Sequence, residues 1–500
     1  MNNTYYLACE LGLEQGRVIL GILSKGQLTL REVHAFPVKT QLVKGVLSWD
    51  LVSLEKETFA GIEKAAALDL PISGLSANSW DGDYVLLDAK DQFLQLPACG
   101  GKGQCEDAAE RLLKKLPMAT IYAETGIPLL PLHTLFQIEA EHLADPTLFQ
   151  RADYFLPIAD YLNTRFSGVA ACEESLASTT QLYNPKTHAW SPKLIAALNL
   201  PDSIMPRLVP SGTAFGPVVD ELRRHPALLN TRVVATCSHA KAAAIAAIPA
   251  RTEQTWAYLH SDTWSQFGIE KTSPIMSTQA CEDGFTNEVG LGGAIHFLKN
   301  SIGLGLVQEC RRAWAAAGRG YSEEQLTHLA LESGPATAHI APGDPRFRSP
   351  GNLPEKITAY CRETDQPAPA TPGEFVRVIL ESLALAHGET LGQLEALTGR
   401  EIEVLHIVGR GAQNEFLNQL IADSTGLPVI VGPADDAAIG NILIQALALW
   451  HLKSPDHMRS IVSTSFPTQI YKPGYGFEKK IRDRFRNLSE SQQQAQPLAA

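Results

Sequence analysis

The chain has 500 residues, of which 45% are hydrophobic and 19% are charged, and its formal net charge at pH 7 is −12. A chain of this length exceeds what one hydrophobic core usually organises, so we expect two domains. The acidic balance argues against nucleic acid as a partner, because phosphate binding requires clustered Lys and Arg side chains. No apolar run is long enough to span a bilayer, so we expect no membrane partner either.

The first residues and the cysteines indicate a compartment. The segment MNNTYYLACE contains neither the basic region nor the small-residue cleavage site of an export signal. The eight cysteines are scattered and form no CxxC pair, which is typical of reduced thiols. We therefore expect a cytoplasmic protein.

The first half of the chain alternates patterns typical of strands and helices. Apolar runs predict strands at residues 5–12, two strands within 17–38 joined at a Lys-Gly turn, a strand at 72–80 and a hairpin at 84–97. A helical pattern covers residues 50–69. Because the alternation continues to residue 250, this half is predicted to be α/β.

The second half repeats the opening strand–turn–strand pattern at residues 255–270 and then becomes richer in helix. Apolar periodicity predicts helices at 296–318, 372–399 and 440–452, and a strand, glycine turn and helix at 404–426. The Pro/Gly-rich stretch 341–356 indicates a surface loop or a small inserted lobe, and the polar tail 489–500 predicts disorder. We place one domain at residues 1–248, a second at 249–465 and a C-terminal extension at 466–500, its last residues disordered.

Collinear segments from about Tyr5 to about Thr468 resemble the FGGY carbohydrate kinases and, within them, the rhamnulokinases. The segments include LTLREVHAF, LSWDLVSLE, YVLLD, GIPLLPLHTLFQ, STTQL, AYLHSDTWS, FTNE, FLKNSIGL, CRETDQP and LHIVGRGAQNEFLNQLIADSTG. The resemblance implies an α/β fold of two actin-like (ribonuclease-H-like) ATPase domains flanking a central cleft. It also implies ATP and Mg²⁺ as cofactors and a small-molecule ketose, L-rhamnulose or a relative of it, as the substrate.

The general base that this resemblance implies is missing. In the family, an aspartate follows a Ser-His pair at the end of a buried strand and accepts the proton of the sugar hydroxyl. Here Ser238-His239 is followed by Ala240, whose methyl group cannot accept a proton. The next residue, Lys241, is a poor base because the ordinary pKa of lysine is about 10.4. We take Ala240 as the position of the lost base and expect His239 to lie beside it.

The resemblance places a first phosphate loop at residues 10–17. Gly12, Gly16 and Arg17 match the family pattern and are expected to bind the nucleotide. Glu10 stands where the family has a metal-associated aspartate, so we expect it to be the metal ligand. Glu14 replaces a small or hydroxyl-bearing residue, and its carboxylate would repel a triphosphate if it faced the site.

The second phosphate loop and the adenosine side are also altered. Asp262 stands where the family usually has a glycine, and it adds a negative charge beside the phosphates. Arg410 replaces the middle glycine of the turn that would cradle adenosine. The nucleotide-binding positions expected here are Thr263, Gly409, Gly411, Gln413 and Asn414, followed by the helix start at 434–441.

The sugar side is partly retained. Trp80, Asp83 and His239 match substrate-binding positions, whereas Asn78 replaces an aspartate. The family's Asp/Arg substrate loop corresponds to the glycine-rich stretch 98–108, which lacks that pair.

The departures from the family pattern fall at the positions expected to act as the base, to bind the metal and to bind the phosphates. The segments that determine folding still match the family. We therefore interpret the chain as a catalytically impaired member of the family, a pseudokinase. Two alternatives stay open: a weak or altered carbohydrate kinase with His239 or Asp83 as its base, and a different reaction in the inherited site. A non-catalytic chain would bind a sugar, or a partner that is either a second copy or another protein.

Overall fold

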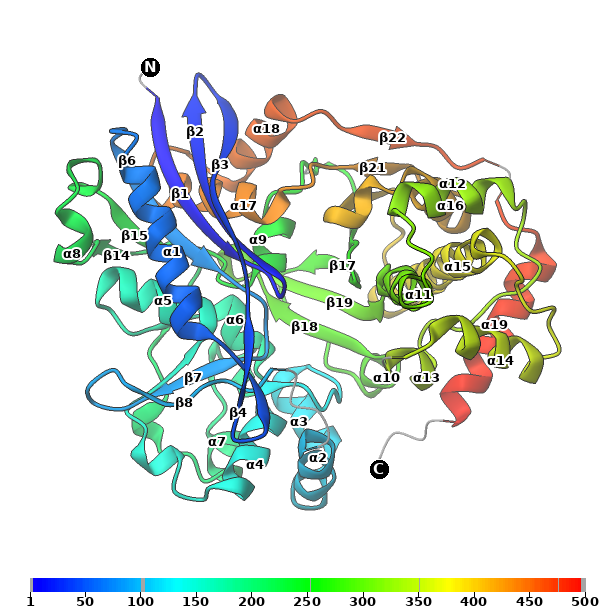
Figure 1. Cartoon of the computed structure of the whole chain (residues 1–500), viewed down its shortest axis with the longest axis horizontal. Coiled ribbons are helices and arrows are strands. Elements are labelled where there is room, and N and C mark those ends of the chain that lie inside the picture. Colours follow the sequence, from blue (N-terminus) through cyan, green and yellow to red (C-terminus); the bar gives the residue numbers. More distant parts are fainter. Residues whose placement is uncertain (1–2, 100–103, 252, 350, 475, 496–500) are drawn as a thin grey trace.

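The computed structural model describes residues 3–99, 104–251, 253–349, 351–474 and 476–495. Figure 1 shows two α/β halves side by side, one coloured blue to green and the other green to red. A six-stranded sheet forms the centre of the first half and a seven-stranded sheet the centre of the second.

The N-terminal sheet has the order β14-β15-β6-β1-β2-β3. Its strands are β1 (Thr4–Leu11), β2 (Gln15–Ser24), β3 (Gln27–Pro37), β6 (Ile72–Asn78), β14 (Thr213–Pro217) and β15 (Arg232–Ala235). β1 is antiparallel to β2 and β2 to β3, whereas β1, β6 and β15 run parallel. Lys25 and Gly26 both have positive φ, so the Lys-Gly pair forms the tight turn that the sequence predicted.

The C-terminal sheet repeats this arrangement. Its order is β18-β19-β17-β16-β20-β21-β22. From β19 to β22, neighbouring strands pair in the same parallel or antiparallel directions as in the N-terminal sheet read as β3-β2-β1-β6-β15-β14. The strands are β16 (Trp256–His260), β17 (Trp264–Lys271), β18 (Phe285–Val289), β19 (Ile295–Ile302), β20 (Val404–Val408), β21 (Val429–Val431) and β22 (Gln469–Tyr471). The two halves are therefore one architecture used twice, as the repeated strand–turn–strand pattern suggested.

Helices cover the sheets and form a smaller lobe on each half. In the N-terminal half, α1 (Leu51–Ala66) and α5 (Ile158–Ser167) pack on the sheet. The lobe beyond the sheet contains β4 (Thr40–Val43), β5 (Val46–Trp49), β7 (Tyr84–Leu87), β8 (Phe93–Gln95), β9 (Tyr154–Pro157), α2 (Gln104–Lys115), α3 (Met118–Thr125), α4 (Thr134–Ala144) and α6 (Glu174–Thr179). The C-terminal half contains α11 (Gly305–Ala316), α12 (Glu323–Glu332), α14 (Leu353–Glu363), α15 (Pro372–Thr398), α16 (Glu415–Thr425), α18 (Pro455–Ser465) and α19 (Lys479–Ala495).

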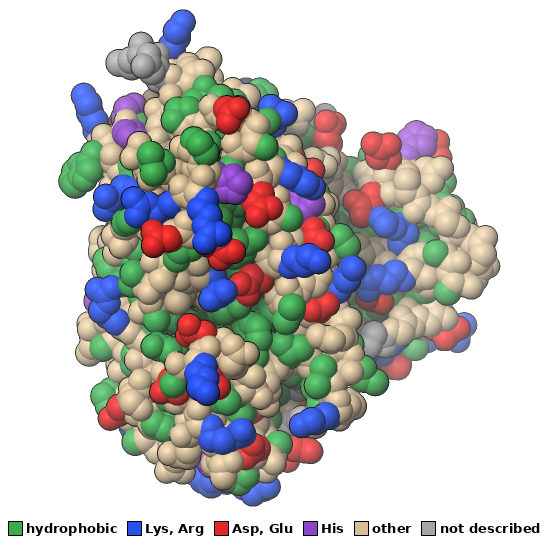
Figure 2. All heavy atoms as spheres, turned by 60° about the vertical axis from the view of Figure 1, so that its left-hand side comes forward, with side chains coloured by type: hydrophobic (Ala, Val, Ile, Leu, Met, Phe, Trp, Pro, Cys, Tyr) green, Lys and Arg blue, Asp and Glu red, His purple; other side chains and the backbone are tan. Residues whose placement is uncertain are grey.

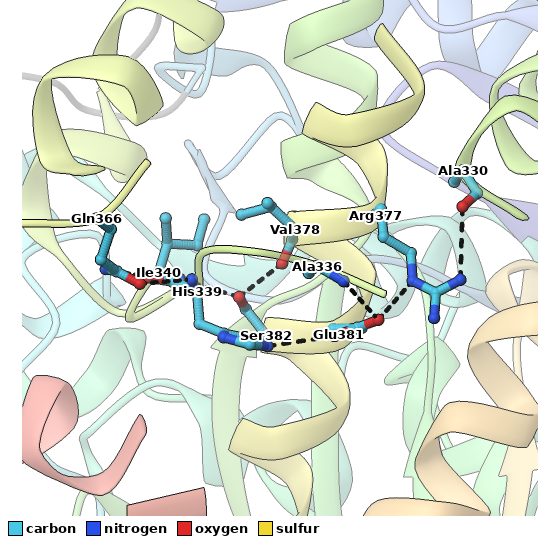
Figure 3. Close-up of polar contacts among 9 residues, drawn as sticks. All are labelled: Ala330, Ala336, His339, Ile340, Gln366, Arg377, Val378, Glu381 and Ser382. Carbon is cyan, nitrogen blue, oxygen red and sulfur yellow. Dashed lines mark hydrogen bonds and ion pairs between the residues drawn. The ribbon is translucent and has the colours of Figure 1, made fainter. Parts of the chain in front are cut away.

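A buried polar network anchors α15, the long helix of the C-terminal half (Figure 3). Glu381 is 3% exposed and accepts hydrogen bonds from Arg377, from the Ala336 N–H and from the His339 ring, whose Nε2 lies 3.2 Å away. The next residue is Ser382, whose hydroxyl accepts a hydrogen bond from the Ile340 N–H at 3.0 Å. A buried carboxylate is tolerated here because each of its oxygens has a hydrogen-bond partner.

The two halves share a core where α9 (Ala240–Ala246) crosses α17 (Asp436–Ala448). Although α17 comes late in the chain, it packs on the N-terminal sheet, with Ile439 and Ile442 in one apolar cluster with Tyr6 and Ala8. At the crossing, a Cβ on Gly440 would collide with the Ala243 carbonyl oxygen. Only glycine lets these two helix backbones approach so closely.

Two expectations about local structure were wrong. Residues 296–302 form β19 rather than helix, because they pair along their whole length with β17; the helix α11 begins only at Gly305. The tail was expected to be disordered from residue 489, but α19 continues through it to Ala495. Residues 496–500 lie outside the described residues.

The surface carries charges of both signs. On the face shown in Figure 2, Lys and Arg side chains are interspersed with Asp and Glu side chains. Within the part of the chain that the structure describes, no helix has the length and apolar character needed to cross a bilayer.

We expect Gly440→Ala to lower the free energy of unfolding by about 1–3 kcal/mol, because the added methyl group is forced against a backbone carbonyl. Gly392, inside α15, is a matched control: a Cβ there meets nothing within 4 Å. Gly392→Ala should therefore stabilise the protein, by up to about 1 kcal/mol. Urea unfolding of both variants measures the difference, and equal stabilities would contradict the close helix crossing.

Candidate active site

The strand β15 leads residues 236–239 to the point where α9 begins. The Ser238 N–H donates to Glu173 Oε2 at 2.8 Å, and the Ser238 hydroxyl donates to Asp160 Oδ1 at 2.8 Å. The His239 N–H donates to Ser175 Oγ at 3.0 Å. These bonds fix the backbone that presents His239 and Ala240.

The two carboxyl groups beneath this segment are fully enclosed. Burial, and next the charge of Glu173, raises the pKa of Asp160 to about 8, and burial raises the pKa of Glu173 to about 7. Close to neutral pH the pair therefore holds on to protons instead of carrying two full charges. Their bonds go to the backbone and hydroxyl of Ser238, so they position the strand end.

His239 lies where the two halves of the molecule meet, a region we call the domain junction: the ends of β6, β15 and β16, the strand β18 and the first turn of α17. His239 is 1% exposed, and neither ring nitrogen has a hydrogen-bond partner among the described residues. Its Nδ1 lies 3.6 Å from Glu288 Oε2 on β18. Burial lowers the pKa of His239 to about 4, so the ring is neutral at pH 7. Burial, and next the charge of Asp81, raises the pKa of Glu288 to about 7.

On the sugar side, Asp83 is engaged inside the protein. Its Oδ2 accepts hydrogen bonds from the indole N–H groups of Trp49 (2.6 Å) and Trp80 (2.8 Å). Its Oδ1 lies 3.3 Å from Gln137 Nε2. Burial raises the pKa of Asp83 to about 6 despite these bonds. Trp80 and Asp83 thus lie together, as the sequence indicated, and they do so as one hydrogen-bonded unit; whether they bind a sugar stays a prediction.

Asn78 is the third residue on this side. It is fully buried; its Nδ2 reaches the Ala437 carbonyl at 3.4 Å, and its Oδ1 has no hydrogen-bond partner among the described residues. Residues 100–103 of the glycine-rich loop at 98–108 lie outside the described residues.

At the first phosphate loop, Arg17 bridges the two halves. Its Nη2 donates to Glu10 Oε2 and its Nη1 to Asp435 Oδ1, each at 2.8 Å. The predicted metal ligand and the predicted phosphate contact therefore bind each other. Burial raises the pKa of Glu10, although the charge of Arg17 opposes this.

The remaining positions of this loop have simpler explanations. A Cβ on Gly16 would collide with the ring of Phe36, so packing alone requires glycine there. Gly12 donates its N–H to the Gln15 carbonyl at 2.9 Å and closes the turn. Glu14 is exposed and makes no side-chain hydrogen bond or ion pair with another described residue.

The two altered positions on the nucleotide side form a pair. Arg410 Nε lies 3.7 Å from Asp262 Oδ2, although the arginine side chain is 73% exposed. The Thr263 hydroxyl donates to Gln308 Oε1 at 3.1 Å. The negative charge of Asp262 is thus partly offset by Arg410.

The glycines on the adenosine side serve a close backbone contact. Gly409 has φ +91°, and a Cβ there would lie 2.5 Å from the Ser261 carbonyl oxygen. A Cβ on Gly411 would collide with the Ser261 side chain. Asn414 caps α16, accepting the Leu417 N–H at 2.9 Å, and Gln413 is exposed. These positions join the turns after β16 and β20, and their nucleotide contacts stay a prediction.

Two family models match the chain and together cover most of it. The N-terminal domain of the FGGY family of carbohydrate kinases matches residues 5–246, and its C-terminal domain matches residues 257–449. The chain belongs to the FGGY family of carbohydrate kinases.

Related proteins agree with this assignment. The rhamnulokinase of Enterococcus faecalis is 37% identical over 487 residues, covering 96% of each chain, and that of Bacteroides thetaiotaomicron is 33% identical over 468 residues, covering 94% of this chain and 96% of the other. Among solved structures, the ligand-bound xylulose kinase of Lactobacillus acidophilus superposes with a TM-score of 0.79 at 14% identity, covering 98% of this chain and 97% of that one. Plasmodium falciparum glycerol kinase with ADP gives 0.77 at 15% identity, covering 98% and 97%. The expected fold of two actin-like ATPase domains is confirmed.

The described residues of this FGGY chain contain no ready-made cluster of metal-binding side chains. No three His, Cys, Asp or Glu side chains converge suitably for a metal ion in the parts of the chain described. Glu10 is held by Arg17, and Asp436 Oδ2 is buried without a hydrogen-bond partner among the described residues. Burial, and next the charge of Glu10, raises the pKa of Asp436 to about 8. Mg²⁺ typically binds through one or two carboxylates together with substrate phosphates, and Glu10 and Asp436 are carboxyl groups available at this end of the junction.

Sequence reasoning missed several junction residues of this FGGY chain. Glu288 lies in the FTNE segment that supported the resemblance, and a charged residue in a fully buried strand was the available signal. His260 and Asp436 lie 3.8 Å apart between Nε2 and Oδ2, which no sequence pattern brought together. Asp81, between Trp80 and Asp83, was not singled out at all.

We expect Asp83→Ala to lower the free energy of unfolding by about 2–4 kcal/mol, because two indole N–H groups lose their acceptor. Asp153 is the matched control: it is exposed, and its carboxylate accepts no hydrogen bond from another described residue. Asp153→Ala should change stability by less than about 1 kcal/mol. Denaturant unfolding checks both values, and a small effect at Asp83 would show that its bonds to the tryptophans are not structural.

Proposed function

We propose that this chain binds a ketose and ATP with Mg²⁺ at the domain junction and transfers phosphate much more slowly than family members with an aspartate after the Ser-His pair. The observation that carries the proposal is Ala240. The Ser238-His239 backbone that leads to it is held by an intact buried network, but the Ala240 side chain is a methyl group. The substrate class follows from the relatives, which are rhamnulokinases, so L-rhamnulose or a related ketose is the substrate we propose.

The chemistry explains why this one position matters. Phosphoryl transfer needs positioned phosphates and an acceptor for the proton of the attacking hydroxyl. Removing a general base typically slows a reaction by about 10²–10⁴-fold. Binding need not suffer equally, since Trp80 and Asp83 form one hydrogen-bonded unit and the buried ring nitrogens of His239 have no hydrogen-bond partner among the described residues.

The nucleotide side supports impaired rather than absent ATP binding. Its two arginines, Arg17 and Arg410, are both paired with carboxylates of the protein. A triphosphate would have to replace those carboxylates as the partner of each arginine. Such exchange lowers affinity without excluding the nucleotide.

We expect Ala240→Asp to raise kcat for L-rhamnulose at least about 10-fold, because it restores a carboxylate at the end of β15. Ala368→Asp adds the same charge at an exposed loop position and should leave kcat unchanged. A coupled assay of ADP release measures turnover, and thermal-shift titrations with MgATP, L-rhamnulose and L-fuculose measure binding. No stabilisation by any ketose or by MgATP would refute the proposed function.

The Asp262–Arg410 pair predicts opposite effects of two substitutions on MgATP binding. Asp262→Gly removes a negative charge and frees the arginine, so the Kd should fall about 10-fold; Arg410→Gly should raise it. Asp91→Gly, at an exposed turn of the β7–β8 hairpin, makes the same change elsewhere and should have no effect. Isothermal titration calorimetry gives the three values, and unchanged affinity in both loop variants would mean that phosphates do not reach this pair.

A further inference from the structure

The segments that follow β6 and β15 leave the sheet side by side. Ser79 and His239 form a parallel bridge, in which the Ser79 N–H donates to the Ser238 carbonyl and the Ala240 N–H donates to the Ser79 carbonyl, each at 2.9 Å. The chain after Ser79 therefore enters the junction next to the position that lacks its carboxylate. Two residues later it carries Asp81.

The turn that holds Asp81 is fixed by α4. Gly82 has φ +90°, and its carbonyl accepts hydrogen bonds from the Thr134 hydroxyl at 2.7 Å and from Gln137 Nε2 at 3.2 Å. Asp83 follows and is held by the two tryptophans. Asp81 thus lies between Ser79 and Gly82, whose backbones are both anchored, while its own carboxylate accepts no side-chain hydrogen bond from another described residue.

The Asp81 carboxylate shares its surroundings with the groups next to Ala240. Burial raises its pKa, but the opposing positive charge of Lys241 is the main cause that brings it down to about 2. The same carboxylate contributes to raising the pKa of Glu288, which lies against His239. Asp81 is therefore ionised at neutral pH and belongs to the group of side chains around the missing base.

Several polar atoms around Ala240 have no hydrogen-bond partner among the described residues, and a bound ligand could provide one. Both ring nitrogens of His239 are buried without a hydrogen bond, and the Lys241 amine makes no hydrogen bond or ion pair with another described residue. Buried polar groups are normally hydrogen-bonded, so unpartnered ones indicate a place for a polar molecule. A sugar hydroxyl has the donor and acceptor that these atoms need.

We propose that Asp81 accepts the proton of the attacking ketose hydroxyl, replacing from β6 the carboxylate that β15 has lost. This role rests on the proposed function. The hydroxyl oxygen forms a bond to the γ-phosphorus of ATP, and its proton passes to an Asp81 carboxylate oxygen. The bond between that phosphorus and the β–γ bridging oxygen breaks, and ADP leaves with the electron pair. A carboxylate that takes up the hydroxyl proton has the same task in protein kinases.

Asp81 is better suited to this role than the two bases that the sequence suggested. Both oxygens of Asp83 accept hydrogen bonds within the protein, and the residue is 8% exposed. His239 is neutral, and among the described residues Glu288 is the carboxylate that lies within ion-pair distance of its ring. The Lys241 amine, close enough to act on the pKa of Asp81, helps to keep that carboxylate ionised beside Glu288.

The test compares four chains: the natural protein, Asp81→Asn, Ala240→Asp and the double variant. Asp81→Asn should lower kcat for L-rhamnulose about 10²-fold with KM changed less than about 3-fold. In the Ala240→Asp background, the same substitution should lower kcat less than about 3-fold, because the restored carboxylate takes the proton. Asp91→Asn, at the exposed β7–β8 turn, is the control for a lost carboxylate elsewhere.

Each other outcome overturns this role. Equal losses in both backgrounds would indicate a structural effect of Asp81, and an unchanged kcat would show that it takes no proton. If calorimetry detects ketose and MgATP binding but the natural chain produces no phosphorylated ketose, Asp81 is not a base, while the binding part of the proposed function survives. If neither ligand binds, the proposed function itself is wrong.

Discussion

The crossing of α9 and α17 is the constraint on which the rest of the structure depends. Gly440 allows the two helix backbones to touch at Ala243, and this contact joins a C-terminal helix to the N-terminal sheet. His239 and Ala240 are the N-cap and the first residue of α9, and Asp435 and Asp436 are the N-cap and the first residue of α17. One backbone contact therefore sets the distance between the start of α9 and the start of α17.

The glycines that the chain shares with its family have packing reasons of their own. Gly16 makes room for Phe36, and Gly409 and Gly411 make room for Ser261. Their retention follows from the fold and does not by itself imply a bound nucleotide. Two of the charged departures, Asp262 and Arg410, face each other, whereas Glu10 is paired with Arg17, which matches the family pattern. In the Asp262–Arg410 pair each charge limits the effect of the other, which is easier to reconcile with an altered site than with random loss.

Much of the fold could be predicted from the sequence because its signals are local. The Lys25-Gly26 turn, the capped helix α1 and the two strand–turn–strand units all follow from patterns within about twenty residues. Residues 296–302 were misassigned because their pairing partner, β17, lies in a separate segment, and tertiary pairing overrode the helical periodicity. The site was predicted less well: the contacts of Arg17 with Asp435 and of His239 with Glu288 join residues far apart in the chain. Single positions can be matched to a motif, but a compensating partner 418 residues away cannot.

The unsatisfied atoms at the junction bear on whether the site has merely decayed. A buried polar group without a hydrogen bond costs about 1–3 kcal/mol, and His239 has two such nitrogens. Asn78 Oδ1 and Asp436 Oδ2 are further buried atoms of this kind among the described residues. Apolar substitutions could relieve this cost if nothing bound here, since replacing a buried polar group by an apolar one of similar shape is often neutral or stabilising. The polar atoms are instead gathered on both sides of the junction. That arrangement is expected of a protein whose native cycle includes a polar ligand between its two domains.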